Sequence, residues 1–226
     1  MSSILAVLFD CDGVIADSEE SWNEIDREHL QAFGVPDYQG QYKPQVIGKS
    51  YMLSDDFYRT TFGIEAALEE MVEQRVGVAA RFYGEIIPTF EDVPSVLEAL
   101  KSRGLKLALA TSSVGQLIHP FLQRHDIAKF FDFVVTGEQV KNGKPHPDIY
   151  LKAAEGVGVA PENCLVVEDA LAGLQAGRSA GCQTVAIPDP RWMDVKEFEG
   201  KADFQIERLS ELVGLVDEQN AEKDAL

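Results

Sequence analysis

Two aspartates follow directly after the first apolar segment of the chain. The run from Ile4 to Phe9 ends at Asp10-Cys11-Asp12-Gly13, so both carboxylates stand at the end of a predicted buried strand. Like charges that share a site of low dielectric must be neutralised by protonation, by a cation or by strong hydrogen bonds. A divalent cation would resolve this conflict. The structural alternative is an Asx-type turn, because Asp and Gly are ordinary turn residues.

Two later apolar runs also end in polar residues. The run that ends at Ala110 is followed by Thr111, Ser112 and Ser113, and the run that ends at Val167 is followed by Glu168 and Asp169. Lys144 stands in a separate predicted loop, Asn142-Gly143-Lys144-Pro145. Ligands of open parallel sheets bind at the carboxyl ends of the strands. We therefore expect the carboxylates, the hydroxyl cluster and the lysine to meet at one edge of a sheet.

This set of side chains predicts a site for a metal and a phosphate. Mg²⁺ prefers hard oxygen ligands, usually one or two carboxylates with substrate phosphate and water, and Asp10 and Asp169 suit that role. Zinc is a poor candidate because no Cys/His cluster has ligand spacing. A phosphate needs hydrogen-bond donors and positive charge, which Thr111, the amides after it and Lys144 can supply. The predicted chemistry is phosphoryl transfer.

Each of these elements also has a purely structural interpretation. Thr111 could cap a helix, since Ser and Thr favour that position, and Lys144 could be a solvated loop lysine. Glu168 and Asp169 could open the next helix, where carboxylates complement the helix dipole. Independent caps need not fall in this order at three strand ends, so we favour a common site.

The elements that must position these residues predict an α/β protein with a doubly wound parallel sheet. Helical patterns lie between the later apolar runs, and the runs are continuous rather than alternating, as strands covered on both faces require. Pro94 and Gly104 mark the start and end of one connecting helix. The expected strands are Ile4 to Phe9, Leu105 to Ala110, Phe133 to Val135, Cys164 to Val167, and Thr184 to Ile187.

One interval breaks the alternation and predicts an inserted helical domain. Residues 17–87 contain no strand-like run, so the core is expected to comprise residues 1–16 and 88–226. Ser18 is expected to cap the first inserted helix. A second helix is expected over Ala66 to Ile86, with a loop at Tyr42 to Met52 between them. Because the insertion hangs over the strand ends, it could act as a lid. The polar residues from about Asp217 onward are expected to fray.

Composition excludes several classes of partner. The 226 residues carry a formal net charge of −18, which argues against nucleic acid or an anionic membrane surface as partner. No segment approaches the 18 or more apolar residues of a membrane span. The three cysteines lie in or beside apolar segments and predict free buried thiols. These features, with no targeting segment at the N-terminus, predict a cytoplasmic protein. The sequence does not decide the oligomeric state, and a monomer is our default expectation.

In order and spacing, the four motifs resemble those of the haloacid dehalogenase superfamily. They are Asp10-Cys11-Asp12-Gly13, Thr111, Lys144, and Glu168-Asp169, and they span the whole core. The resemblance implies that Asp10 attacks phosphorus to form an aspartyl-phosphate, and that Asp12 protonates the leaving alcohol and then activates water. It further implies that Thr111 holds the phosphoryl group and that Lys144 offsets negative charge. Glu168 and Asp169 would anchor Mg²⁺, which Asp12 would contact through its carbonyl.

The inserted helices resemble the first cap class of that superfamily. Phosphoglycolate phosphatases, sugar-phosphate phosphatases and β-phosphoglucomutases share this class. Gly48, Lys49 and Ser50 fall where cap residues of these enzymes reach the active site. The resemblance implies a Mg²⁺-dependent phosphatase acting on a small phosphorylated metabolite, with a sugar or polyol phosphate as the expected substrate.

Two alternatives to this function stay open. The mutases carry a histidine after the second aspartate and an arginine in the cap loop, and Trp22 and Tyr51 stand at the matching places here. That departure argues against mutase activity. A non-catalytic binding protein that kept the fold is the other alternative, and the presence of every catalytic residue argues against it.

Overall fold

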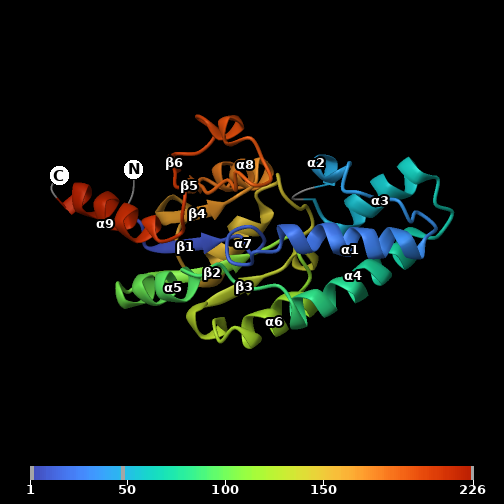
Figure 1. Ribbon diagram of the computed structural model, residues 1–226. Coiled ribbons are helices and arrows are strands. Elements are labelled where there is room, and N and C mark those ends of the chain that lie inside the picture. The colour runs from blue at the N-terminus through green and yellow to red at the C-terminus, as the bar shows by residue number, and fades with distance from the viewer. Residues whose placement is uncertain (1–2, 47–48, 225–226) are drawn as a thin grey trace.

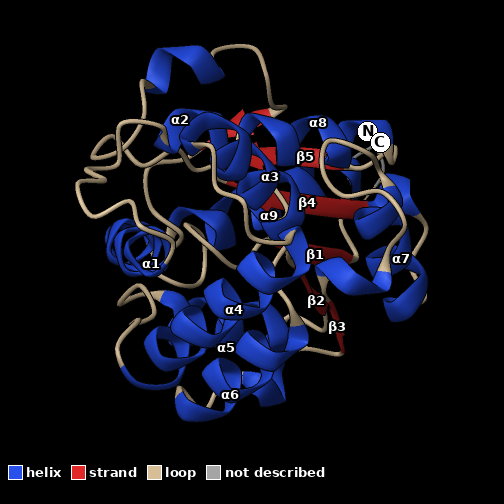
Figure 2. Cartoon of the chain, turned by 90° about the vertical axis from the view of Figure 1, so that its right-hand side faces the viewer, coloured by secondary structure: helices blue, strands red, loops and turns tan. Residues whose placement is uncertain are grey.

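The computed structural model describes residues 3–46 and 49–224. Its centre is a six-stranded parallel sheet in the order β3-β2-β1-β4-β5-β6 (Figures 1 and 2). The strands are β1 (Ala6–Phe9), β2 (Lys106–Ala110), β3 (Phe133–Val135), β4 (Cys164–Glu168), β5 (Gln183–Ala186) and β6 (Phe204–Gln205). The α/β fold and the five predicted strands are confirmed, with ends shifted by one or two residues. β6 is a two-residue edge strand that the sequence did not predict.

Helices cover both faces of the sheet, which explains why the strands are apolar on both sides. Strand residues such as Val7 and Leu107 pack in one cluster with helices α5 (Val93–Ser102), α6 (Gly115–Arg124) and α9 (Glu211–Asp224). Their neighbours Ala6 and Ala108 point to the opposite face and pack with α7 (Asp148–Val157) and α8 (Leu171–Ser179). Fraying is predicted from about Asp217, but α9 continues to Asp224, and the Asn220 side chain exchanges hydrogen bonds with the backbone of Ile4.

The helical insert consists of α1 (Glu19–Ala32), α2 (Lys43–Val46), α3 (Tyr51–Phe62) and α4 (Leu68–Glu85), between β1 and β2. In Figure 1 the insert lies beyond the carboxyl ends of the strands, on the side of the molecule opposite both chain ends. The sequence pattern does not predict α3, and α2 and the start of α3 lie in the segment Tyr42 to Met52 that is predicted as a loop. α3 carries a predominantly aromatic inner face, with Tyr58 and Phe62 packed on Tyr38.

Two linkers join the insert to the core, and they run side by side. Asp17 N donates to Pro88 O over 3.0 Å, and Phe90 N donates to Ile15 O over 3.2 Å. α4 also packs on α6, with the Tyr83 and Phe121 ring centroids 5.8 Å apart. The insert is therefore attached to the core at the carboxyl edge of β1. No helix of the described residues is both long and apolar enough to cross a bilayer.

Candidate active site

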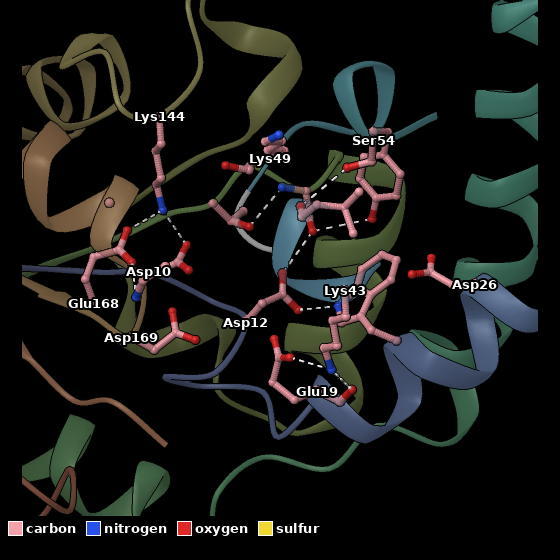
Figure 3. Close-up of a pocket in the computed structure, with 18 of the residues that line it drawn as sticks. Asp10, Asp12, Glu19, Asp26, Lys43, Lys49, Ser54, Lys144, Glu168 and Asp169 are labelled. Carbon is pink, nitrogen blue, oxygen red and sulfur yellow. Dashed lines mark hydrogen bonds and ion pairs between the residues drawn. The ribbon is translucent and has the colours of Figure 1, made fainter. Parts of the chain in front are cut away.

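The register of three strands explains how distant motifs meet. Phe9 of β1 lies opposite Leu109 of β2 and Val167 of β4, so these strands end at the same level. The residue after Phe9 is Asp10, and the residue after Val167 is Glu168. Figure 3 shows their side chains in one cavity, together with Asp12, Lys144 and Asp169. The convergence expected from the sequence is observed.

Lys144 lies between two of the carboxylates. Its Nζ is 2.7 Å from Asp10 Oδ1 and 2.6 Å from Glu168 Oε1, and it donates to Ala110 O over 3.1 Å. The lysine side chain is buried. Although burial by itself lowers the pKa of Lys144, Asp10 and Glu168 raise it above its usual value. The lysine is therefore a fixed positive charge within the site.

Three buried acids form a group that could hold a metal ion. Oxygen atoms of Asp10, Glu168 and Asp169 all lie within 4.8 Å of one another. Burial, opposed by Lys144 and assisted by Glu168 and Asp12, raises the pKa of Asp10 to about 7. Burial, with Glu168 and Asp10, also raises the pKa of Asp169 well above its usual value. Three carboxylates with one lysine leave an excess of negative charge, so the hard oxygen donors fit a divalent cation.

Two glycines allow these acids to approach so closely. A Cβ on Gly13 would lie 2.0 Å from Asp169 Oδ2, and the φ of Gly13 is +76°, in the left-handed region. A Cβ on Gly173 of α8 would lie 1.8 Å from Glu168 Oε1. Tyr150 also donates a hydrogen bond to Glu168 Oε1. Glycine is therefore needed at both positions for Asp169 and Glu168 to occupy their observed places.

Asp12 has surroundings quite different from those of Asp10. Its Oδ1 accepts hydrogen bonds from Ser18 Oγ at 2.7 Å, from Trp22 Nε1 at 3.4 Å and from the Tyr83 hydroxyl. Its Oδ2 accepts from Ser113 Oγ at 2.9 Å. All four donors are neutral, whereas Asp10 faces an ammonium group. Two carboxylates that are only two residues apart are thus separated into different chemical environments.

One prediction about these donors needs correction. Ser18 stands at the N-cap position of α1, but its side chain makes no cap hydrogen bond, and its hydroxyl donates to Asp12. Trp22 packs on the core, and its indole also donates to Asp12 while the ring lines the cavity.

The hydroxyl cluster and the insert loop also reach the cavity. Thr111 is fully buried, and its Oγ1 accepts from Ser113 N at 3.0 Å. Thr111, Ser112 and Ser113 line the cavity beside Lys49, whose side chain is exposed. Of the other two predicted loop residues, Gly48 lies outside the described residues, and Ser50 caps α3 by accepting from Leu53 N.

Several cavity residues of the insert were not predicted. Glu19, Asp26, Lys43, Tyr51, Ser54 and Arg75 all line the cavity. Glu19 and Asp26 stand three residues before and four after Trp22, which places all three on one stripe of α1. That spacing is the signal that could have identified them. Lys43 and Arg75 are brought in by packing of separate helices and leave no such local signal.

Comparisons with known proteins agree with this geometry. The profile of the haloacid dehalogenase-like hydrolases matches residues 7–187. The chain is 35% identical to a phosphorylated carbohydrates phosphatase of Thermotoga maritima over 180 residues, 80% of this chain and 83% of that protein. It is 29% identical to hexitol phosphatase B of Escherichia coli over 210 residues, 92% of this chain and 94% of the relative.

A solved structure is similar over nearly the whole chain. The structure of β-phosphoglucomutase from Clostridium difficile has a TM-score of 0.83 and 27% sequence identity, and the match covers 99% of this chain and 100% of the mutase. The sheet topology, the insert between β1 and β2 and the profile match lead to one conclusion. The chain belongs to the haloacid dehalogenase-like hydrolases.

Proposed function

We propose that this protein is a Mg²⁺-dependent phosphatase that hydrolyses a small phosphorylated sugar or polyol through an aspartyl-phosphate on Asp10. The proposal rests on one observation: two neighbouring carboxylates have different surroundings. Asp10 lies among the acid group and Lys144, whereas Asp12 is held by four neutral donors. Nucleophilic catalysis followed by hydrolysis needs one carboxylate of each kind.

In the first step, a carboxylate oxygen of Asp10 attacks phosphorus and the bond from phosphorus to the ester oxygen breaks. Asp12 gives its proton to the departing alkoxide. In the second step, Asp12 takes a proton from the water that attacks phosphorus, and the bond from phosphorus to the Asp10 carboxylate breaks, which regenerates Asp10 and releases inorganic phosphate. The hydroxyls of Ser18 and Ser113 can rotate between donating and accepting, so both protonation states of Asp12 can be satisfied.

The remaining residues would bind and balance charge. Thr111, Ser112 and the backbone amides that follow would hold the phosphoryl oxygens, and Lys144 would balance the charge of nucleophile and phosphate. Asp10, Glu168 and Asp169, with the carbonyl of Asp12, would hold Mg²⁺. The ion would supply further neutralisation of the phosphoryl charge.

Residues 17–87 are proposed to act as a lid. The volume of the cavity is about 90 Å³. A phosphorylated sugar is larger, and movement of the insert away from the core would enlarge the cavity for it. The paired linkers at Asp17 and Pro88 are the natural place for that movement.

The test is release of phosphate from hexitol phosphates and from an aryl phosphate, with Mg²⁺ present. We expect Asp10→Asn to lower the rate by at least 10³-fold, since the amide cannot act as the nucleophile. Asp217→Asn is the matched control, because Asp217 lies in an exposed ion pair with Arg103. A wild-type protein that releases no phosphate from any ester, at any divalent metal concentration, would favour a non-catalytic binding protein instead.

A phosphomutase is the second candidate, because the fold matches that of a β-phosphoglucomutase. Trp22 binds Asp12 and lines the cavity where the mutases carry a histidine, and Tyr51 lines it where they carry an arginine. We therefore expect hydrolysis to exceed transfer. A hexose 1-phosphate supplied with a bisphosphate activator distinguishes the two, since a mutase would accumulate the 6-phosphate faster than free phosphate.

A further inference from the structure

The wall of the cavity that the insert contributes carries two acid–base pairs. Glu19 Oε2 lies 2.7 Å from Lys43 Nζ, and Asp26 Oδ1 lies 2.5 Å from a terminal nitrogen of Arg75. The side chains of these four residues are 5–16% exposed, and all line the cavity. Figure 3 shows Glu19, Lys43 and Asp26 on the side of the cavity opposite Lys144. Within each pair the charges cancel.

The groups around these pairs do not change that balance. Asp55 lies behind Arg75, with its Oδ1 3.2 Å from the other terminal nitrogen. Lys49 lines the rim and makes no ion pair within residues 3–46 and 49–224. Asp55 adds one negative charge and Lys49 adds one positive charge. The wall as a whole therefore has no excess of positive charge.

Arg75 is fixed in place but has an unused donor. Its guanidinium carbon lies 5.3 Å from the Trp22 ring centroid and 5.6 Å from those of Tyr51 and Tyr58. Its two terminal nitrogens bind Asp26 and Asp55. Its Nε is buried and has no acceptor among the described residues. A buried donor without an acceptor is costly. Because this nitrogen is shielded from solvent, a ligand oxygen would reach and satisfy it only after the surrounding side chains move apart.

The two acids of the wall have acceptor capacity to spare. Asp26 accepts one hydrogen bond at each oxygen, from Arg75 and from the Tyr58 hydroxyl at 2.8 Å. A carboxylate offers about four acceptor sites in all. Glu19 is engaged by Lys43. The wall thus offers a donor and several acceptors within one small, partly aromatic space.

We propose that the Glu19–Lys43 and Asp26–Arg75 pairs recognise the hydroxyl groups of an uncharged polyol or sugar chain and discriminate against phosphate esters that carry a second anionic group. This inference rests on the proposed phosphatase function. A hydroxyl both donates and accepts, which matches acceptors on Glu19 and Asp26 and the donor on Arg75. The faces of Trp22 and Tyr51, whose centroids are 5.7 Å apart, provide apolar surface for the carbon chain.

An anionic tail would fit this wall poorly. A carboxylate or second phosphate can only accept hydrogen bonds, and here it would face the carboxylates of Glu19 and Asp26, which line the cavity. The cations beside them are already neutralised, and in a partly desolvated cavity the repulsion is screened less than in water. Lys49 at the rim is a cation, and its charge would favour substrates that carry a second anionic group.

The experiment compares two substrates in the full-length protein with Mg²⁺. One is a hexitol 6-phosphate, with five uncharged hydroxyls, and the other is phosphoglycolate, which carries a carboxylate. We expect kcat/KM of the wild type to favour the hexitol phosphate by at least 100-fold. Glu19→Gln and Asp26→Asn keep the size of the side chain but remove its charge, and each should reduce this preference at least tenfold, with higher KM for the hexitol phosphate.

Glu24→Gln is the matched control, because Glu24 lies on the same helix in an exposed pair with Arg27. It should leave the preference unchanged. Circular dichroism verifies folding, and either of the two cavity variants suffices if the other does not fold. A wild type that prefers phosphoglycolate or a sugar bisphosphate overturns the proposal, as do cavity variants whose preference stays within twofold of the wild type.

This outcome is distinguishable from failure of the proposed function. Phosphate release from an aryl phosphate and from phosphoglycolate, without release from the hexitol ester, would contradict the recognition of hydroxyls and the sugar or polyol substrate, but not phosphatase activity through Asp10. Absence of release from all three esters would contradict the phosphatase function itself.

Discussion

Tyr83, on the last helix of the insert, donates a hydrogen bond to Oδ1 of Asp12, on the loop after the first core strand. The contact joins the part of the molecule proposed to move to the carboxylate proposed to transfer the proton. Burial raises the pKa of Tyr83 well above its usual value, and Asp12 raises it further, so the phenol stays a donor. Closure of the insert would therefore orient Asp12 for catalysis.

Tyr83→Phe should lower kcat/KM for an alkyl phosphate by about tenfold, since hydrogen bonds to charged groups contribute about 1.5–3 kcal/mol. The loss should be smaller for an aryl phosphate, whose leaving group departs without a proton. Steady-state kinetics with both esters verifies this difference. Tyr38→Phe removes another buried hydroxyl of the insert, bound to Tyr58 instead, and should affect both esters alike. An equal loss for both esters in Tyr83→Phe would indicate a purely structural role.

Asp169→Asn should have opposite effects on two properties: it should stabilise the metal-free protein and weaken metal binding. In the metal-free protein, burial, Glu168 and Asp10 raise the pKa of Asp169, so its ionised form destabilises the fold. The amide should therefore raise the melting temperature without metal. Mg²⁺ at 100 times its Kd should stabilise the wild type by about 2.7 kcal/mol, and this increment should be lost in the variant. Thermal unfolding with and without Mg²⁺ measures both effects.

Asp217→Asn again serves as control for that comparison. Asp217 is exposed on α9, so its amide variant should keep the full increment from Mg²⁺. An Asp169→Asn protein that is stabilised by Mg²⁺ as much as the wild type would exclude Asp169 from the metal site.

The ionised carboxylate of Asp132 should stabilise the protein to an extent that depends on pH. Partial burial raises its pKa, but hydrogen bonds from Lys101, the backbone of Leu107 and Lys106 outweigh this and lower the pKa to about 2. A carboxylate with a depressed folded-state pKa contributes stability above its unfolded value, near 4, and loses it as the pH falls toward 2. Asp132→Asn should therefore cost about 1 kcal/mol at pH 7.

The measurement is the melting temperature of wild type and variant between pH 7 and pH 3. The gap between them should be constant above pH 5 and should narrow below pH 4. A gap that stays constant down to pH 3 would mean that the ionised form of Asp132 makes no special contribution.

The contrast between core and insert explains what the sequence could predict. Asp10 and Thr111 follow buried strands and Glu168 ends one, and the carboxyl edge of a parallel sheet brings strand ends together independently of the loop conformations. Their convergence was therefore predictable. Arg75 and Lys43 reach the cavity because α4 packs against α1 and α2 packs against α3, and this tertiary packing has no local sequence pattern. Ser18 has the residue type and position of a helix cap, but its hydroxyl is turned toward Asp12, to which it donates, and it accepts no hydrogen bond from the start of α1.

Gly173 and Gly77 both lie within helices, but replacing them with alanine should have opposite effects on stability. A Cβ on Gly173 of α8 would lie 1.8 Å from Glu168 Oε1, whereas a Cβ on Gly77 of α4 would meet no atom within 4 Å. Gly77→Ala should therefore stabilise the protein by up to about 1 kcal/mol, because alanine favours the helix. Gly173→Ala offers the same gain in propensity but must displace Glu168 from Lys144 and the other acids. Its melting temperature should fall and the concentration of Mg²⁺ needed for half-maximal phosphatase activity should rise at least tenfold. If both alanine variants were equally stable and active, Glu168 would not need its observed position, and the close approach of α8 to the acid group would have no part in metal binding.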